Sequence, residues 1–170
     1  MKKLEILGID IGNTIIDGSL ADKPAYPDAV RVIRRLLSER FSPERTHLIS
    51  KVNEEQHARV VRWLQDNDFF AVTGLLPENL HFCPERADKA AICDRLGVTH
   101  HIDDRPEVHY HLQGIVEHRY MFRHGLNTDS PDPDFLKERE GFMERLTGVE
   151  LVTSWKKVEE ILLPFRLASE

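Results

Sequence analysis

An acidic side chain stands at the end of the first apolar segment of the sequence. Asp10 directly follows residues 6–9, and a carboxylate beside a buried strand is costly unless it is paired or has a function. The residues Gly12, Asn13 and Thr14 are small or turn-prone and suit a tight loop around a phosphate. Two unrelated enzyme classes use such an aspartate. One uses it as a nucleophile on phosphate esters, and the other uses it as a magnesium ligand beside ATP.

Further polar side chains fall where other strands are expected to end. Ser50 closes the apolar segment THLIS, and Asp103 and Asp104 directly follow VTHHI. Lys89 lies in RADKAAICDRLG, which has the pattern of a helix. In a parallel sheet the carboxyl ends of the strands share one edge, and ligands bind there. We therefore expect these side chains to lie close to Asp10.

Strand-like and helix-like segments alternate along the chain. The apolar pattern predicts strands at residues 4–11, 46–50, 80–83, 98–102 and 118–123. Helices are predicted at residues 28–40, 54–70, 86–97 and 105–114, and residues 149–165 are expected to supply a last strand-like piece and a closing helix. This alternation predicts an α/β fold, a three-layer sandwich in which helices cover both faces of a mostly parallel sheet. Residues 125–135, which contain two prolines, are expected to form a long surface loop.

Length and composition are those of an ordinary globular protein. The 170 residues are 41% hydrophobic and 31% charged, and this length suits a single domain over residues 1–170. A net charge of −6 gives no signal for nucleic acid or for an anionic membrane surface. Cys83 and Cys93 form neither a CxxC pair nor a disulfide framework. The first residues are too polar for a signal peptide or a membrane span, so we expect a cytoplasmic protein.

The order of the polar residues resembles the haloacid dehalogenase-like (HAD) superfamily, which consists mostly of phosphatases and phosphotransferases. The resemblance rests on an ordered set of four motifs, carried by Asp10, Ser50, Lys89 and Asp103–Asp104. Its most specific part is the segment DKAAICDRLGVTHHIDDRPE. The flanking segments suit the Rossmann-like core of the superfamily, and the resemblance therefore implies that fold.

The resemblance implies a magnesium-dependent phosphatase reaction. Asp10 would attack phosphorus and form an aspartyl-phosphate. Mg²⁺ would be held by Asp10, Asp103 and the backbone carbonyl of Gly12. Asp104 would bind a water molecule on the metal or orient Lys89.

The resemblance also implies how the phosphoryl group is bound. Lys89 would neutralise charge on the nucleophile and on the transferred group, and Ser50 would donate a hydrogen bond to a phosphoryl oxygen. Backbone amides of the loop that contains Gly12, Asn13 and Thr14 would do the same. Thr14 would also hold this loop in place.

Two positions depart from the pattern of the superfamily. Gly12 stands where its phosphatases usually carry a second aspartate, which acts as general acid and then as general base. Asn13 stands where a glycine is usual. The loss of a positioned acid commonly costs about 10²–10⁴ in rate. We therefore expect slow turnover, a borrowed acid–base group, or a substrate with a good leaving group.

Little of the sequence is left for a large cap domain. Residues 11–49 and 51–88 are largely filled by the elements predicted above. Capless members of the superfamily have open sites, and they often act on macromolecules or are closed by a partner. We expect an open site for a phosphorylated small molecule or macromolecule, closed by a protein partner or by a small lid from residues 125–135.

Two other functions stay open from the residues alone. The segment IDIGNT is also like the opening of type III pantothenate kinases, in the sugar-kinase/actin/Hsp70 superfamily, where Gly12 and Asn13 are expected. Such kinases need two Rossmann-like halves and further glycine-rich loops, and no two of the nine glycines here are adjacent. The other function is non-catalytic. In it a HAD-like domain without turnover binds a phosphorylated ligand or a partner protein.

Each motif residue also has a purely structural interpretation. Ser50 could cap the helix that begins near Glu54. Lys89, in a helix rich in charge, could be an ordinary solvated lysine. Asp103 and Asp104 could cap the helix that follows them and interact favourably with its dipole.

Six histidines lie between residues 100 and 124, and imidazole groups beside Asp103 could bind a transition metal. However, His100 and His101 are adjacent in a strand and point to opposite faces of it. His109 and His111, two apart in a helix, do not share a face. The spacing therefore does not favour a histidine metal site.

Overall fold

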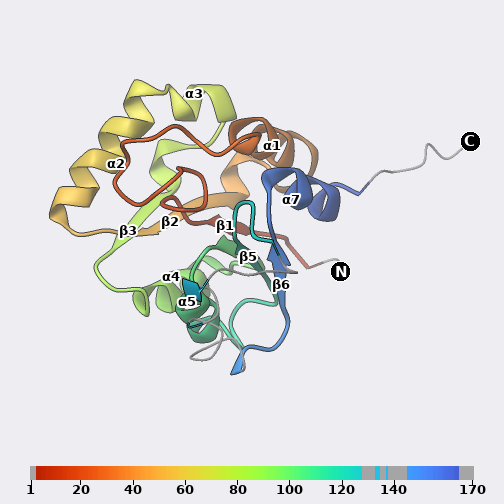
Figure 1. Cartoon of the computed structure of the whole chain (residues 1–170). Coiled ribbons are helices and arrows are strands. Elements are labelled where there is room, and N and C mark those ends of the chain that lie inside the picture. Colours follow the sequence, from red (N-terminus) through yellow and green to blue (C-terminus); the bar gives the residue numbers. More distant parts are fainter. Residues whose placement is uncertain (1–2, 128–132, 135–136, 138–144, 165–170) are drawn as a thin grey trace, which may run out of the picture.

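The computed structural model describes residues 3–127, 133–134, 137 and 145–164, and its strands form an all-parallel sheet (Figure 1). The strands are β1 (Leu7–Ile9), β2 (Thr46–Lys51), β3 (Leu80–Cys83), β4 (His100–Asp103), β5 (His118–Phe122) and β6 (Val149–Val152). They lie in the order β3-β2-β1-β4-β5-β6. The chain runs outward from β1 to β3 and then returns to β4, on the other side of β1. Open α/β sheets bind ligands at such a reversal.

Helices cover both faces of the sheet (Figure 1). One face carries α1 (Ala29–Leu36), α2 (Glu54–Asp66), α3 (Phe69–Thr73) and α7 (Trp155–Leu162). The other face carries α4 (Asp88–Leu96) and α5 (Pro106–His111). Three short helical segments complete the connections: η1 (Leu37–Phe41), η2 (Pro43–Arg45) and η3 (Pro77–Asn79).

A hydrophobic core lies on each face of the sheet. The larger core, which includes Leu7, Ile9 and Trp155, lies against α1, α2, α3 and α7. The smaller core includes Ile49 and lies against α4 and α5. Successive strand residues point to opposite faces, so Gly8, between Leu7 and Ile9, faces the smaller core. The central strand is therefore buried on both faces.

The predicted α/β architecture, with a parallel sheet between two helical layers, is confirmed. No large cap is present in residues 11–49 or 51–88, which hold only a loop, α1 to α3, the short η segments and β3. The predicted single helix over residues 54–70 is wrong, because the chain turns at Asp68 with φ 47° and α3 begins after it. Most of the lid expected at residues 125–135 lies outside the described residues.

Within the described ranges, none of the helices combines the length and the apolar character that a membrane crossing requires.

His100 is a buried, neutral side chain at the start of β4. Its Nε2 lies 3.3 Å from the guanidinium of Arg40, and its Nδ1 lies 2.8 Å from the hydroxyl of Thr99. Arginine can only donate, so Nε2 accepts and Nδ1 carries the proton. Burial lowers the pKa of His100 to about 4, with a further contribution from the positive charge of Arg40. The side chain is built into the fold in its uncharged form.

We predict that His100 makes the protein less stable in acid. Its folded-state pKa of about 4 lies below the value of about 6.5 in an unfolded chain. Its contribution is therefore complete above pH 6.5 and is lost as the pH falls from 6.5 to 4. The loss is up to about 1.4 kcal/mol per pH unit. Urea unfolding at pH 7.5 and pH 5 should show a smaller acid loss for His100→Gln than for the wild type. An equal loss in both proteins would contradict this prediction.

Candidate active site

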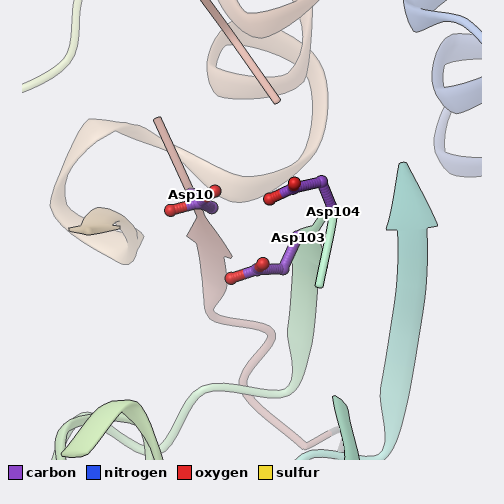
Figure 2. Close-up of side chains that lie close together, drawn as sticks. All are labelled: Asp10, Asp103 and Asp104. Carbon is purple, nitrogen blue, oxygen red and sulfur yellow. The ribbon is translucent and has the colours of Figure 1, made fainter. Parts of the chain in front are cut away.

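Three carboxylates meet at the carboxyl edge of the sheet. Asp10 follows β1, Asp103 ends β4, and Asp104 follows it. Figure 2 shows the three side chains extending toward a common space, and an oxygen of each lies within 4.8 Å of the others. All three are buried. Because β1 and β4 are neighbours at the reversal of strand order, the fold itself brings these carboxylates together.

Lys89 lies between two of these carboxylates. Its Nζ donates to Asp10 Oδ1 at 2.8 Å and to Asp103 Oδ2 at 2.6 Å. The residue is in the first turn of α4 and only 2% exposed. Burial alone would lower the pKa of Lys89, but the two carboxylates outweigh it and the pKa is raised. The interpretation of Lys89 as a solvated lysine is therefore wrong.

One lysine does not balance three buried carboxylates. Burial and the charge of Asp103 raise the pKa of Asp10, and burial with both neighbours raises the pKa of Asp104. Burial acts in the same direction on Asp103, but Lys89, His101 and His109 together outweigh it and the pKa of Asp103 is lowered. The mutual repulsion of the carboxylates, which contributes to the raised pKa values of Asp10 and Asp104, favours a bound cation. Carboxylate oxygens are the ligands that Mg²⁺ prefers, so this donor set fits the expected metal.

The loop after β1 is held by contacts from distant elements. Asn13 has φ 58°, a left-handed conformation that asparagine tolerates better than most residues, which explains how it occupies a position where glycine is usual. The hydroxyl of Thr14 donates to Asp10 Oδ2 at 3.2 Å. Trp155 Nε1, from α7, donates to the carbonyl of Thr14 at 2.8 Å. The conformation of the loop thus depends on both the nucleophile candidate and the last helix.

Two backbone amides of this loop, which were expected to donate to phosphoryl oxygens, donate to backbone carbonyls instead. The amide of Asn13 donates to the carbonyl of Gly18 at 3.0 Å, and that of Thr14 donates to Ile11 at 3.3 Å. In this arrangement neither amide is directed at a phosphoryl group. The side chain of Asn13 instead borders the cavity in front of Asp10.

Ser50 borders that cavity, which has a volume of about 180 Å³ and is also lined by Asp10, Gly12 and Lys89. The alternative role of Ser50 as a helix cap is wrong, because the N-cap of α2 is Asn53. Asn53 accepts a hydrogen bond from the amide of the residue three positions later, whose side chain accepts one in return. Ser50 is buried at the end of β2 and available to the cavity.

Several cavity residues were missed by reasoning from the sequence. Lys51 and Arg105 each directly follow a predicted site residue, and Arg86 precedes Lys89 by three positions. Proximity to a motif was the available signal, but it does not tell which side chains turn inward. Arg86 also forms an ion pair with Glu107 of α5 at 3.2 Å. The wall of the cavity therefore adds positive charge around the carboxylates.

Two buried histidines support Asp103 from behind. His101 Nε2 lies 3.1 Å from Asp103 Oδ2, and His109 Nε2 lies 2.9 Å from the carbonyl oxygen of Asp103. Burial opposes protonation of His101, but Cys93 and Asp103 outweigh it and raise its pKa to about 9. The sequence raised histidines only as metal ligands. In the described residues the group that could hold a metal consists of the three aspartates.

The comparisons with known proteins add information on the fold. No protein-family model and no curated protein sequence matches the chain. A solved structure from Burkholderia xenovorans LB400, described as a haloacid dehalogenase-like hydrolase, is similar with a TM-score of 0.55 and 15% sequence identity. The similarity covers 88% of this chain and 61% of that one. The chain has a haloacid dehalogenase-like fold.

The HAD-like fold agrees with the sheet order and with the position of Asp10 at the end of the central strand. At 15% identity the likeness concerns the fold alone, and this chain spans less than two thirds of that protein. The kinase interpretation required two Rossmann-like halves. The strands of the described residues instead belong to one six-stranded sheet.

We predict that Gly8 makes room for the histidine behind the site. A Cβ atom at Gly8 would lie 2.6 Å from His101 Nδ1, and the histidine would have to move away from Asp103. Gly8→Ala should therefore lower the free energy of unfolding by about 1–3 kcal/mol, the usual cost of overpacking. Gly12→Ala is the matched control, because a Cβ there meets its nearest atoms at 3.5 Å. Urea unfolding measures both, and a Gly8→Ala protein as stable as the control would contradict the prediction.

Proposed function

We propose that the protein is a magnesium-dependent phosphohydrolase that cleaves phosphomonoesters through an aspartyl-phosphate on Asp10. The observation that carries this proposal is the position of Asp10. Its carboxylate lies at a cavity, is paired with Lys89 at 2.8 Å, and shares the site with Asp103 and Asp104. The HAD-like fold places it at the sheet edge where ligands bind.

The three carboxylates, with the backbone carbonyl of Gly12, would hold Mg²⁺. When bound, the ion supplies positive charge that lets an anionic carboxylate approach an anionic phosphate. Lys89 adds positive charge between Asp10 and Asp103, because it contacts both. Ser50 and Asn13 border the same cavity and offer hydrogen bonds to phosphoryl oxygens.

The proposed reaction has two displacements at phosphorus. A carboxylate oxygen of Asp10 forms a bond to phosphorus while the bond from phosphorus to the ester oxygen breaks, and the leaving oxygen takes a proton from water. A water molecule then attacks the phosphorus of the aspartyl-phosphate, loses a proton to solvent, and releases Asp10. The sum is one phosphomonoester and one water converted to an alcohol and inorganic phosphate.

Gly12 determines which substrates such a site favours. Glycine at this position offers no side chain that could protonate the leaving oxygen, and a positioned acid is worth about 10²–10⁴ in rate. The backbone leaves space for a side chain at position 12, since an added Cβ would meet Ser19 and Gly18 only at 3.5 and 3.6 Å. Leaving groups that depart as stable anions are therefore favoured over simple alcohols.

A non-catalytic binding domain is the second candidate, and the pairing of Lys89 favours it. Buried charges without a ligand would destabilise a site that has lost its function. Here Lys89, Asp10 and Asp103 satisfy one another, so the fold tolerates the site without turnover. In this case the open site would bind a phosphorylated ligand or a protein partner.

Hydrolysis of para-nitrophenyl phosphate tests the nucleophile. Its leaving group departs without a proton, so the test avoids the missing acid at Gly12. We expect magnesium-dependent release of nitrophenol by the wild type, loss of activity after chelation, and no activity above background in Asp10→Asn. Asp22→Asn, an exposed aspartate in the same connection, is the control and should be fully active. Wild-type activity in Asp10→Asn would refute the assignment, and no activity in folded wild type would favour the binding domain.

Gly12→Asp tests the missing acid. We expect it to raise kcat for 2-glycerol phosphate, whose alkoxide needs a proton, by about tenfold or more. The gain with para-nitrophenyl phosphate should be much smaller. Gly12→Ala, which adds only the Cβ, is the control and should give no such difference between the two substrates. If Gly12→Asp folds and the ratio of kcat for 2-glycerol phosphate to kcat for para-nitrophenyl phosphate is unchanged, the missing acid does not limit turnover.

A further inference from the structure

A second, larger cavity adjoins the site. It has a volume of about 500 Å³ and shares Asn13, Asp104 and Arg105 with the cavity in front of Asp10. Such a volume lies in the usual range for small-molecule sites. A phosphoryl group held at Asp10 would therefore have its ester oxygen near a space large enough for the rest of the substrate.

One wall of this cavity is aromatic. Tyr26 and His124 stack with ring centroids 4.6 Å apart and planes 26° apart, and Tyr26 also meets Phe122 at 5.4 Å. Phe122 is fully buried at the end of β5, Tyr26 is half-buried before α1, and His124 is exposed. The rings of Tyr26 and His124 thus form a surface suited to a planar group, and the buried ring of Phe122 supports Tyr26 from within the core.

Charged side chains also line this cavity. They are the two arginines Arg105 and Arg123 and the acidic residue Asp104. The guanidinium of Arg105 lies 3.4 Å from Asp104 and is shared with the smaller cavity. Positive side chains therefore lie beside the space in which a leaving group would develop negative charge.

We propose, building on the phosphatase function above, that the substrates are aryl phosphates, whose ring lies against Tyr26 and His124. The bond from phosphorus to the phenolic oxygen breaks as the bond to Asp10 forms, and the phenolate leaves and later takes a proton from water. A phenol has a pKa of about 10, so its anion departs without general acid catalysis. The substrate class thus matches both the aromatic wall and the absence of an acid at Gly12.

Aryl phosphates have two sources, small phenolic phosphates and phosphotyrosine in proteins. Both present the same ring and the same ester. Comparison of free phosphotyrosine with a phosphotyrosine peptide separates them. A higher kcat/KM for the peptide assigns the site to a protein, and an equal or lower value assigns it to a small molecule.

Four substrates separate the ring from the leaving group. Phenyl phosphate has a ring and a stable leaving anion, benzyl phosphate has only the ring, acetyl phosphate has only the stable anion, and 2-glycerol phosphate has neither. We expect phenyl phosphate to exceed benzyl phosphate in kcat by about tenfold or more. We also expect a KM for phenyl phosphate below that for acetyl phosphate.

His124→Ala tests the aromatic wall, and His111→Ala, a histidine of α5 outside the cavity, is the control. The loss of one ring contact should raise the KM for phenyl phosphate about threefold to tenfold more than that for acetyl phosphate. His111→Ala should change neither the KM for phenyl phosphate nor the KM for acetyl phosphate. Tyr26→Leu removes a second ring and should act in the same direction.

The outcomes distinguish this inference from the proposed function. If Asp10-dependent hydrolysis of acetyl phosphate is found but His124→Ala affects both substrates equally, the aryl assignment is wrong and the phosphatase stands. If none of the four substrates is hydrolysed, the phosphatase proposal fails. Calorimetry with phenyl phosphate then tests whether the larger cavity binds the aryl ring. Weaker binding by His124→Ala than by His111→Ala supports this assignment, and equal binding by the two variants overturns it.

Discussion

The site depends on the buried ammonium group of Lys89. Its contacts to Asp10 and Asp103, at 2.8 and 2.6 Å, link α4 to the ends of β1 and β4 through one side chain. Taking carboxylates out of water is unfavourable, and the remaining members of a buried ion cluster become costly when one is removed. Lys89 and its two partners therefore form one unit. Its members could change during evolution only together, or with a replacement charge bound in the cavity.

A second layer of contacts keeps this unit in position. His101 and His109 hold the side chain and the carbonyl of Asp103, and His101 fits because Gly8 of the neighbouring strand has no side chain. Thr14 holds the other oxygen of Asp10. Each carboxylate in the central pair is thus restrained from two sides. Preorganisation of this kind reduces the rearrangement needed when charge moves during a reaction.

Much of the fold followed from the pattern of apolar segments. The strands, their parallel arrangement and the meeting of Asp10 with Asp103 could be predicted, because short buried strands alternating with helices leave few topologies. The end of α2 before Asp68 could not be predicted, because it depends on one residue with a left-handed backbone in an otherwise helical pattern. The supporting role of His101 was also missed. It depends on the empty position at Gly8, which becomes its neighbour only when β1 pairs with β4.

The aromatic wall was not visible in the sequence for a related reason. Tyr26 and residues 122–124 are distant along the chain, and only the position of β5 beside β4 brings them together. The contact between Trp155 and the carbonyl of Thr14 has an even longer sequence separation. During synthesis, the loop that carries Asn13 and Thr14 cannot make this contact until α7 has left the ribosome. A ribosome-bound nascent chain that ends before α7 therefore carries the three aspartates but lacks the hydrogen bond from Trp155 to this loop.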